Sequence, residues 1–456
     1  MPPSVSEAED HRLELDWDVI ILGGGAAGLC AAIRAAEGGV RVLVAEKNRR
    51  PGVKILMSGG TRCNLTNARG LRSLRGVTGP VDPAYDPRHA QGARSIQQAF
   101  GANGKFLGPA LRSFSVEDSV ALFESEGVAT KVEGNGKIFP ASDKATDVLD
   151  ALLRRLRRSS AEVRCGWPAG AVRPWGDGFR VAFPGGLATA RRVILAVGGQ
   201  SYPGCGTVGD GYAIAQRFGH SLVEPRPALV PIRVEAGWVQ GLKGLTVPDV
   251  DAAVFDPTGR KMLQRREALL FAHFGLTGPS ILDVSRAVAR YDGEGRTDLS
   301  LDFLPDLRAE TLDQQVRDAC RVGRRAVAGL LPPAIPRRLA EALVASAGVP
   351  AERMGPDLSR DERRRLVGSC KDLRLAVSGT LGFAKAEVTS GGVCLDEVDP
   401  ATLESRLVPG LHFAGEVLDL DGLIGGYNFQ AAWSTGWLAG ESAAAAAMAG
   451  RPTREL

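Results

Sequence analysis

The spacing of apolar and polar residues near the start of the chain predicts a strand, a helix and a second strand in succession. Residues 19–22 are an apolar run, an alanine-rich helical run follows residue 25, and residues 40–46 are a second apolar run that ends in a carboxylate. A glycine cluster, G-x-G-x-x-G at 23–28, separates the first strand from the helix. Together these features are typical of a dinucleotide-binding βαβ unit.

The key positions of this unit each have a physical reason. Gly23 permits a tight turn, Gly25 lets the backbone approach a pyrophosphate, and Gly28 lets the helix pack closely on the sheet. The helix N-terminus offers N–H groups and a positive dipole end to the phosphates. Glu46 stands where an acid accepts hydrogen bonds from a ribose hydroxyl. The alternative is a glycine-rich turn in an ordinary α/β sheet; if a dinucleotide binds, the residues expected to hold it are Gly23, Gly25, Ala26, Ala27, Gly28 and Glu46.

The apolar spacing predicts further elements up to residue 200. Helices are expected at 111–125 and 142–158, the second with Ser142 as its N-cap and an apolar stripe along one side. Three short strand-like runs, expected to form a small meander, and a buried-type strand that ends in two glycines follow at 162–165, 171–173, 179–183 and 192–199.

The pattern changes after residue 201. Residues 307–367 have helical spacing that prolines interrupt, so a few short helices are expected there. A strand at 410–415 and a helix from 428 to about 448 predict a return to the first sheet. Alternating runs separated by turn signals predict a β-rich module, with strands at 229–234, 250–255 and 299–303.

These changes predict an α/β protein in which one Rossmann-like domain is interrupted by another domain. At 456 residues the chain is too long for one ordinary core. The expected boundaries are 1–16 for a disordered tail, 17–201 and 386–456 for the dinucleotide-binding domain, and 202–385 for the inserted domain, with its β-rich part at 222–304 and its helical part at 305–370.

Composition narrows the classes of function. The hydrophobic content of 44% and charged content of 24% are typical of a soluble globular protein. The net charge of +4 is small for this length, and the arginine clusters at 154–158 and 363–365 lie in helical patterns, so no nucleic-acid partner is expected. Seven scattered cysteines without a C-x-x-C pair argue against disulfides and zinc, and no metal is expected. With no signal peptide or long apolar stretch, we expect a cytoplasmic protein without membrane attachment, and its oligomeric state stays open.

The late return to the first sheet separates two kinds of dinucleotide-binding protein. A simple NAD dehydrogenase builds its dinucleotide fold from contiguous sequence. In two-dinucleotide-binding flavoproteins, a late strand that ends in Ala-Gly-(Asp/Glu) brings an acid to the ribityl chain, and the next helix N-terminus points at the flavin ring. Residues 413–416 and 425–429 fit these two parts, which favours a flavoprotein.

Four longer motifs are more specific than the glycine cluster. They are GVKILMSGGTRCNLTN at 52–67, GGQSYPGCGTVGDGY at 198–212, LFAHFGLTGP at 270–279, and GEVLD at 415–419 with GGYN at 425–428. In the same order, these motifs resemble the BaiN/YhiN-like bacterial flavoprotein family, often described as NAD(P)/FAD-dependent oxidoreductases or as aminoacetone-oxidase-family FAD-binding enzymes. The resemblance spans residues 18–440 and implies FAD in the outer domain and an inserted domain of a β-barrel plus helices. One departure is Thr61, where the family pattern has a third glycine.

The loop at 47–67 is rich in Gly, Ser and Asn, so it needs a role other than packing. Its N–H groups, positive charges and amides, including that of Asn67, are suited to wrap a flavin dinucleotide, and the alternative is a solvated loop. Cys63 has no second cysteine nearby, which favours packing or a cofactor contact over redox catalysis. Beyond the βαβ unit, the residues expected to bind FAD are Lys47, Lys54, Ser58, Gly59, Gly60, Arg62, Cys63, Asn64, Gly198, Gly199, Gly415, Glu416, Gly425, Gly426, Tyr427 and Asn428.

The electron donor and the acid–base group have weaker signals. Gly204, Gly206 and Gly209 spell a second G-x-G-x-x-G, but residues 200–203 separate it from its strand, which favours a glycine-rich crossover beside FAD over a nicotinamide site. NAD(P)H is expected as co-substrate without a fold of its own. His273, in a dense motif of the inserted domain, is a candidate substrate-side acid, and the alternative is a structural histidine in a turn.

We therefore predict an FAD-dependent oxidoreductase, with a reductase favoured over an oxidase. NAD(P)H would reduce FAD, and hydride would pass through flavin N5 to a small-molecule substrate in the cleft between the two domains. Two alternatives stay open. One is a flavin-binding protein that acts on or interacts with RNA, as in tRNA modification, against which the missing basic stripe counts. The other is an oxidase that uses O₂.

Overall fold

Contacts divide the chain into two compact units. The structure is a computed structural model, and the residues it describes are 15–159 and 161–449. Of the described residues, the first unit contains those up to 199, residues 205–224 and those from 391 to 449, and the second contains 200–204 and 225–390. Residues 205–224, which composition places in the inserted domain, therefore lie in the first unit.

The expected tail lies mostly outside the described residues, which begin at Leu15. Leu15 is buried, and the main-chain N–H of Asp16 donates to Thr189 Oγ1 at 3.0 Å. These two residues therefore belong to the first unit rather than to a tail.

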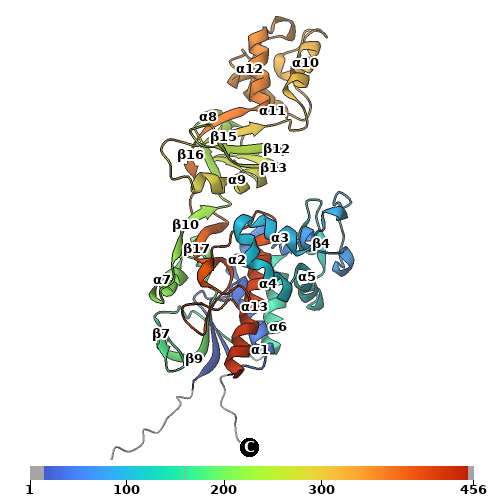
Figure 1. Ribbon diagram of the computed structural model, residues 1–456. Coiled ribbons are helices and arrows are strands. Elements are labelled where there is room, and N and C mark those ends of the chain that lie inside the picture. The colour runs from blue at the N-terminus through green and yellow to red at the C-terminus, as the bar shows by residue number, and fades with distance from the viewer. Residues whose placement is uncertain (1–14, 160, 450–456) are drawn as a thin grey trace, which may run out of the picture. The chain divides into compact units, whose positions relative to one another are not determined.

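The first unit is built on a mainly parallel sheet with the strand order β6-β2-β1-β9-β8-β7, in which β18 also pairs with β9 (Figure 1). The parallel strands are β1 (Trp17–Leu22), β2 (Val42–Glu46), β6 (Glu162–Cys165), β9 (Gly186–Leu195) and β18 (Leu411–Phe413). Two further strands, β7 (Val172–Trp175) and β8 (Gly178–Phe183), form an antiparallel meander with β9. The prediction that 162–165 belongs to this meander is wrong. The preceding helix carries the chain back along the sheet, so this strand pairs in parallel with β2.

Both faces of this sheet are buried. Alternate residues of β1 enter two different cores, with Val19 and Ile21 packed beside the first helix and Ile20 and Leu22 packed beside residues such as Phe179 of the meander. Burial on both sides explains why the strand is an uninterrupted apolar run instead of an alternating one.

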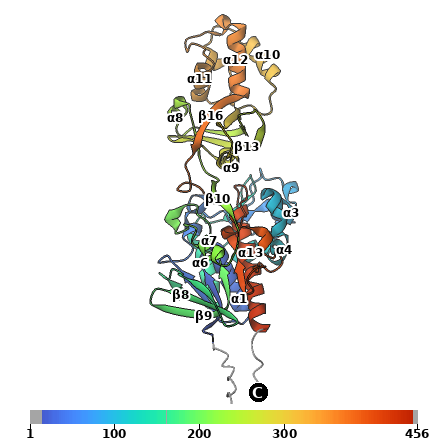
Figure 2. The same ribbon diagram turned by 60° about the vertical axis from the view of Figure 1, so that its left-hand side comes forward.

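The two ends of the first unit meet in a pair of closely packed helices, α1 (Ala26–Glu37) and α13 (Tyr427–Ala449), which lie side by side in Figures 1 and 2. A Cβ added at Gly436 would lie 2.2 Å from the carbonyl oxygen of Ala27, and one added at Gly440 would lie 2.3 Å from that of Ala31. Only glycine permits this approach, which brings the last helix of the chain onto the first.

Two helix predictions need correction. The run 111–125 is two helices, because Phe114 is extended and Ser115 starts the second helix with a capping box that includes Asp118. The predicted N-cap Ser142 is also wrong, because the helix begins at Ala145 and the Ser142 hydroxyl bonds to Asp147 at 2.6 Å. The helices of this part are α2 (Val53–Met57), α3 (Ala93–Ala99), α4 (Gly108–Ser113), α5 (Val116–Ser125), α6 (Ala145–Arg158) and α7 (Asp210–Arg217), and a small sheet is formed by β3 (Thr66–Asn67), β5 (Lys137–Pro140) and β4 (Thr130–Val132).

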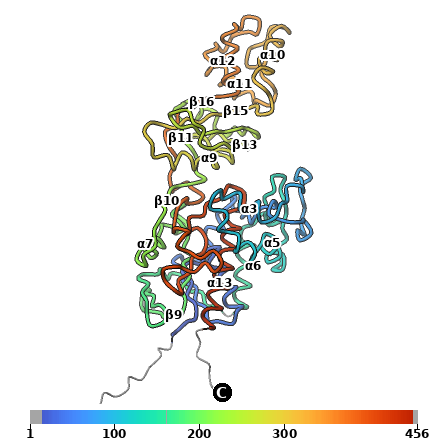
Figure 3. The backbone as a smooth tube through the Cα atoms, viewed as in Figure 1, coloured from blue at the N-terminus to red at the C-terminus, as the bar shows by residue number. Residues whose placement is uncertain are grey.

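The second unit contains a closed six-stranded barrel followed by helices, which Figure 3 traces along the chain. In barrel order the strands are β11 (Ile232–Val234), β14 (Gly275–Thr277), β13 (Lys261–Ala272), β12 (Thr246–Phe255), β15 (Asp298–Asp302) and β16 (Leu373–Thr380). Its helices are α8 (Gly237–Gly241), α9 (Pro279–Ala289), α10 (Ala309–Ala319), α11 (Arg337–Ser346) and α12 (Arg360–Lys371). The paired strands β10 (Leu222–Ala228) and β17 (Val388–Val393) contain two of the chain crossings between the units, and the other two lie at the ends of the short segment 200–204. The predicted fold class, a Rossmann-like domain interrupted by a barrel and helices, is confirmed.

Candidate dinucleotide site and family membership

The glycine turn between β1 and α1 has one position open to a ligand. Gly23 has φ +101°, and a Cβ there would lie 2.5 Å from the carbonyl oxygen of Ala196; a Cβ at Gly28 would lie 1.9 Å from that of Gly23. Gly25 differs, because a Cβ there would have no described atom within 4 Å. Gly23 and Gly28 are therefore required by the fold, whereas the open space at Gly25 fits the approach of a pyrophosphate.

The N-terminus of α1 is suited to bind an anion. The helix has no acidic residue in its first turn, and no described side chain caps it. Its N-terminal N–H groups and positive dipole end are therefore available to phosphate oxygens next to Gly25. Ala26 and Ala27 form this first turn, and a Cβ at Gly415 would lie 2.8 Å from the Cβ of Ala27. The late Ala-Gly-Glu motif thus lies against the start of the first helix.

The carboxylate of Glu46 is held beside the glycine turn. It is 6% exposed, its Oε2 accepts a hydrogen bond from the N–H of Gly24 at 2.7 Å, and its Oε1 accepts one from the N–H of Asn48 at 2.7 Å. A carboxylate has about four acceptor positions, so both oxygens keep capacity for ribose hydroxyls. The structure therefore places Glu46 at the end of β2 in a fixed orientation that fits the predicted ribose contact.

The two predicted lysines both form ion pairs. Lys54 Nζ lies 2.6 Å from Glu416 Oε2, and both side chains are partly exposed. Lys47 pairs with Asp210 at the start of α7. Sequence reasoning assigned Lys54 and Glu416 separate roles, but they form one pair that joins the early loop to the late Ala-Gly-Glu motif.

The loop after α2 has an unusual backbone. Gly59, Gly60 and Thr61 have φ of +55°, +68° and +70°. Thr61 thus occupies a left-handed conformation that glycine adopts without steric cost, which explains the glycine of the family pattern at this position. Ser58 closes the start of the loop by donating from Oγ to the carbonyl oxygen of Ile55 at 2.8 Å.

Arg62 and Cys63 have partners within the protein. The Arg62 guanidinium bonds to Glu133 at 2.7 Å and Asp143 at 3.3 Å and lies over the ring of Phe139, 4.0 Å from its centroid. Burial raises the pKa of the Cys63 thiol to about 12, so at neutral pH it carries no thiolate for redox chemistry. The structure therefore gives Arg62 partners within the protein and buries Cys63, and the contact of either residue with FAD stays a prediction.

Asn64 and Asn67 join this loop to the late glycine pair. With the Asn64 amide oriented so that both of its atoms have partners, its oxygen accepts from the N–H of Gly426 at 2.9 Å. Asn67 Nδ2 donates to the carbonyl oxygen of Gly425 at 2.9 Å. A Cβ at Gly426 would lie 2.4 Å from the carbonyl oxygen of Thr66, so glycine is required there. The amides therefore hold the turn before α13 and are engaged by the protein itself.

Tyr427 and Asn428 complete the late turn. Tyr427 is 6% exposed, and Asn428 bonds to both the N–H and the carbonyl oxygen of Gly422, at 2.8 and 3.1 Å. The Asn428 amide therefore closes its own loop before the helix begins.

Gly198 and Gly199 lie in a turn that folds back on itself. A Cβ at Gly198 would lie 2.9 Å from Thr207 Cγ2, and the carbonyl oxygen of Gly199 accepts from the N–H of Gly209 at 3.0 Å. The strand after α7 is β10, which pairs with β17 and not with the parallel sheet. The second G-x-G-x-x-G therefore does not open a second βαβ unit.

His273 lies in the second unit, in the turn between β13 and β14. Its side chain is exposed and meets the ring of Phe274 edge-on at 4.8 Å between centroids. Among the described residues it has no hydrogen-bond partner, so no contact of the barrel occupies its nitrogens.

The sequence of this chain matches the family described as HI0933-like protein Rossmann domain over residues 17–77 and 88–442. The chain belongs to this family. It is also 34% identical to a 3-dehydro-bile acid delta(4,6)-reductase of Clostridium scindens, an alignment that covers 93% of this chain and 98% of that protein. The predicted resemblance to BaiN/YhiN-like flavoprotein oxidoreductases is thereby confirmed.

Other HI0933-like relatives have a different substrate in their names. The chain is 33% identical to a ribosomal RNA dihydrouridine synthase of Escherichia coli K12, over 94% of this chain and 98% of that protein. Its fold resembles that of a 3-ketosteroid-delta4-(5alpha)-dehydrogenase of Rhodococcus jostii RHA1, with a TM-score of 0.52, 17% identity and coverage of 96% and 99% of the two chains. The structural likeness supports the fold alone.

Three contacts that hold the site were not predicted. Asn48 belongs to none of the predicted motifs, yet its Nδ2 donates to the carbonyl oxygen of Cys205 at 3.1 Å. Thr435, inside α13, accepts from the N–H of Gly415 at 3.0 Å through its Oγ1. Trp433 is fully buried and donates from Nε1 to the carbonyl oxygen of Leu65 at 2.9 Å. Each joins segments far apart in the chain, for which a single sequence has no local signal.

Two classes of feature are absent from the part of the chain that the structure covers. Within residues 15–159 and 161–449, no helix is both long and apolar enough to cross a membrane. The same residues contain no group of three or more His, Cys, Asp or Glu side chains placed to hold a metal ion.

Proposed function

We propose that this protein is an FAD-dependent reductase that uses NAD(P)H to reduce a carbon–carbon double bond conjugated to a carbonyl group in a small molecule. The observation that carries the proposal is the likeness, at 33–34% identity over most of the chain, to two kinds of enzyme. A 3-dehydro-bile acid with 4,6 unsaturation and a uracil ring share one reactive unit, a C=C bond in conjugation with a carbonyl. Reduction of that unit is the chemistry common to both names.

The site in the first unit supports FAD as the cofactor. The open space at Gly25 and the uncapped start of α1 would receive the pyrophosphate, and Glu46 would accept hydrogen bonds from the ribose. Glu416, held by Lys54, would face the ribityl chain, and the start of α13 would direct its dipole at the flavin ring. When bound, FAD would relay an electron pair between NAD(P)H and the substrate.

The reaction also needs a proton. Reduction of the C=C bond adds a hydride to one carbon and a proton to the other, while NAD(P)H is oxidised to NAD(P)⁺. His273 is our candidate donor of that proton, because its ring nitrogens have no partner among the described residues and its side chain is exposed.

A substrate panel tests the proposal. Under anaerobic conditions, FAD-loaded protein should oxidise NADH or NADPH faster when a 3-oxo-Δ4 steroid or a simple cyclic enone is added, and the product should gain two hydrogens by mass. His273→Gln should lower turnover by about 10² to 10⁴ while FAD content and melting temperature stay at wild-type values. The matched control is His89→Gln, an exposed histidine of the first unit, which should leave turnover unchanged. Lack of any NAD(P)H-dependent reduction across the panel would overturn the proposal.

A second candidate function has one specific observation in its favour, namely the two rRNA dihydrouridine synthases among the relatives, at 33% and 29% identity. In that case the reduced double bond is that of uracil within ribosomal RNA. The same assay with ribosomal RNA as substrate separates the candidates, because dihydrouridine in the digested RNA, without turnover of free enones, would assign the RNA substrate.

A further inference from the structure

One segment of the first unit has a positive charge that the rest of the chain offsets. Residues 68–112 contain seven Arg or Lys side chains and two Asp side chains, so their net charge is +5, whereas that of the whole chain is +4. One of these cations, Arg88, pairs with Asp86. The other six are exposed and form no ion pair with any residue that the structure describes; they are Arg69, Arg72, Arg75, Arg94, Lys105 and Arg112.

The helix α3 places three polar side chains of this segment on one side. Arg94, Gln97 and Gln98 have the spacing of neighbours on one helix face, and each is exposed or half-buried. Ile96 and Ala99, which point to the other side of the helix, are buried. The exposed side of α3 therefore carries a cation followed by two amides.

Two further arginines lie next to the two ends of α3. A Cβ at Gly92, the residue before the helix, would lie 3.8 Å from Arg72 Cγ. A Cβ at Gly108, the first residue of α4, would lie 3.1 Å from Gln97 Nε2 and 3.5 Å from Arg112 Nη1, so these two groups are neighbours. We call the set around α3 the basic band, and its members are Arg72, Arg94, Gln97, Gln98 and Arg112.

The C-terminal end of α3 lies against the turn before α13. The main-chain N–H of Leu423 donates to the carbonyl oxygen of Ala99 at 3.1 Å, and a Cβ at Gly422 would lie 2.8 Å from Cζ of the Phe100 ring. Under the proposed function, this turn faces the flavin ring. A ligand that lies along the basic band therefore extends toward the flavin end of the site.

The chemistry of the basic band matches an RNA strand. Guanidinium groups bind phosphate oxygens through charge-assisted hydrogen bonds, and amides bond to 2′-hydroxyls and base edges. A membrane surface would need exposed apolar side chains beside the cations. No large apolar side chain of residues 68–112, all of which the structure describes, is exposed. The band is therefore suited to a polyanion in water rather than to lipid.

We propose that the basic band binds an RNA strand, with its phosphates on Arg72, Arg94 and Arg112 and one of its bases directed toward the turn before α13. The proposal rests on the second candidate function, in which the reduced double bond is that of uracil in RNA, and it adds the surface that holds the strand. Because the attraction is between cations and phosphates, RNA binding should weaken as the salt concentration rises.

RNA binding by the FAD-loaded protein tests the basic band without any turnover. Fluorescence anisotropy of a labelled single-stranded RNA dodecanucleotide, at several salt concentrations, measures the affinity. We expect the combined variant Arg72→Gln, Arg94→Gln and Arg112→Gln to bind this RNA about tenfold more weakly or worse. The slope of its log association constant against log salt should fall by about 0.7 for each arginine removed. FAD content and melting temperature should stay at wild-type values, because the three side chains are exposed.

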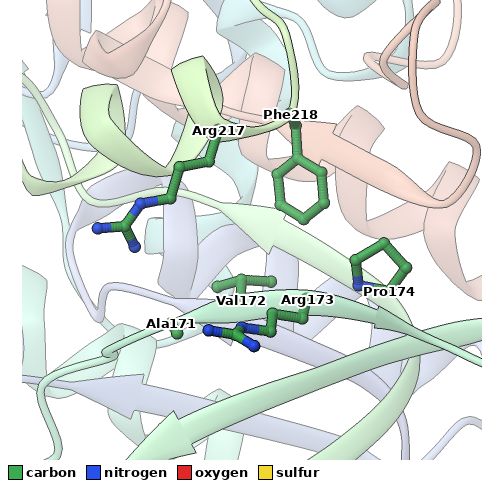
Figure 4. Close-up of a pocket in the computed structure, with 6 residues that line it drawn as sticks. All are labelled: Ala171, Val172, Arg173, Pro174, Arg217 and Phe218. Atoms are coloured by element: carbon green, nitrogen blue, oxygen red, sulfur yellow. The ribbon is translucent and has the colours of Figure 1, made fainter.

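The matched control removes the same charge from elsewhere in the first unit. Arg157 of α6, Arg173 of β7 and Arg217 of α7 are also exposed and have no ion pair with a described residue, and Figure 4 shows the last two. With all three changed to Gln, the protein should bind the dodecanucleotide with close to wild-type affinity. Equal losses in the two combined variants would show that only total charge matters, which overturns the basic band.

Cross-linking locates the bound strand. The same dodecanucleotide with 4-thiouridine in place of uridine should, on irradiation, attach to peptides from residues 68–112, identified by mass. Attachment only to other segments of the chain would contradict the proposal. Phosphatidylglycerol vesicles test the other kind of partner, because vesicle binding that the band variant loses, without RNA binding by wild type, would assign the surface to a membrane and overturn the proposal.

Failure of the proposal and failure of the function on which it rests give different results. No RNA binding by the FAD-loaded wild type overturns the basic band. RNA binding that the band variant loses, without formation of dihydrouridine, keeps the band and counts against the second candidate function alone.

Discussion

The two G-x-G-x-x-G strings of the chain, at 23–28 and 204–209, have the same sequence pattern but different surroundings. Both follow a strand of the parallel sheet, β1 or β9, and both precede a helix. In the first string, Gly25 faces open space and α1 begins without an acidic residue. In the second, a Cβ at Gly206 would lie 2.7 Å from the Asn48 amide, and α7 begins with Asp210.

The comparison shows that the G-x-G-x-x-G letters do not themselves make an anion site. The carboxylate of Asp210 neutralises the positive end of the α7 dipole and pairs with Lys47. The space beside Gly206, the middle glycine of the second string, is occupied by the Asn48 amide, whereas the space beside Gly25 in the first string is open. Open space and an uncompensated dipole therefore distinguish a dinucleotide turn from a glycine-rich crossover.

The largest effect should come from Gly28→Ala. The added Cβ would lie 1.9 Å from the backbone oxygen of Gly23, so the strand and helix must separate. We expect a loss of about 3 kcal/mol or more in the free energy of unfolding, measured by denaturant titration. Gly204→Ala, in the second string, is the control, because a Cβ there meets no described atom within 4 Å. Equal stability of the two variants would contradict the close packing of α1 on its strand.

Gly25→Ala should separate cofactor binding from stability. Its backbone, with φ −83° and ψ −167°, suits any residue, and the Cβ enters open space. The apoprotein should therefore melt at the wild-type temperature, while the dissociation constant for FAD should rise by on the order of tenfold to a hundredfold because the backbone no longer approaches the pyrophosphate. Wild-type affinity for FAD in this variant would remove the first string from the cofactor site.

Glu46→Gln should weaken FAD through the ribose. The substitution removes the negative charge from a group that is 6% exposed, and a hydrogen bond to a charged group contributes about 1.5 to 3 kcal/mol. Equilibrium titration of the apoprotein with FAD measures the change. The second string is not followed by a parallel strand that ends in an acid, so it offers no matching residue, and Glu416→Gln is the comparison instead. We expect a smaller loss of FAD affinity for Glu416→Gln, because Lys54 already pairs with that carboxylate.

Asp210→Asn should have the smallest effect. The Lys47–Asp210 pair is partly exposed, so its loss changes the free energy of unfolding by less than about 1 kcal/mol. FAD affinity should stay within about twofold of wild type if α7 does not bind the pyrophosphate. A large gain or loss of FAD affinity would show that the second string contributes to the cofactor site.

The role of the first glycine string could be predicted because it depends on neighbouring residues, whereas the other contacts of the site could not, because they join distant parts of the chain. Gly23 and Gly28 follow from the geometry of one turn, and the apolar run at 19–22 follows from burial of β1 on both faces. The pairing of Lys54 with Glu416 and the bonds from Asn64 and Asn67 to the late glycine pair join residues more than 300 positions apart. Nothing in the local sequence indicates which of two distant polar groups will meet, because the packing of α13 on α1 decides it.

The break in the expected helix at 111–125 has a local signal that periodicity hides. Ser115 and Asp118 form a capping box, which begins a helix, but the apolar spacing continues through it because α4 and α5 pack on the same cores. The prediction for the strand at 162–165 was wrong for a different reason, since a short apolar run does not indicate which strand it pairs with.

The cofactor itself tests the central claim most directly. Purified protein should be yellow, and denaturation should release FAD, identified by mass, in an amount equal to that of the chain. Release of FMN instead, or a colourless protein that titration with FAD fails to reconstitute, would contradict the assignment of the first glycine string as the FAD site of a flavin-dependent oxidoreductase.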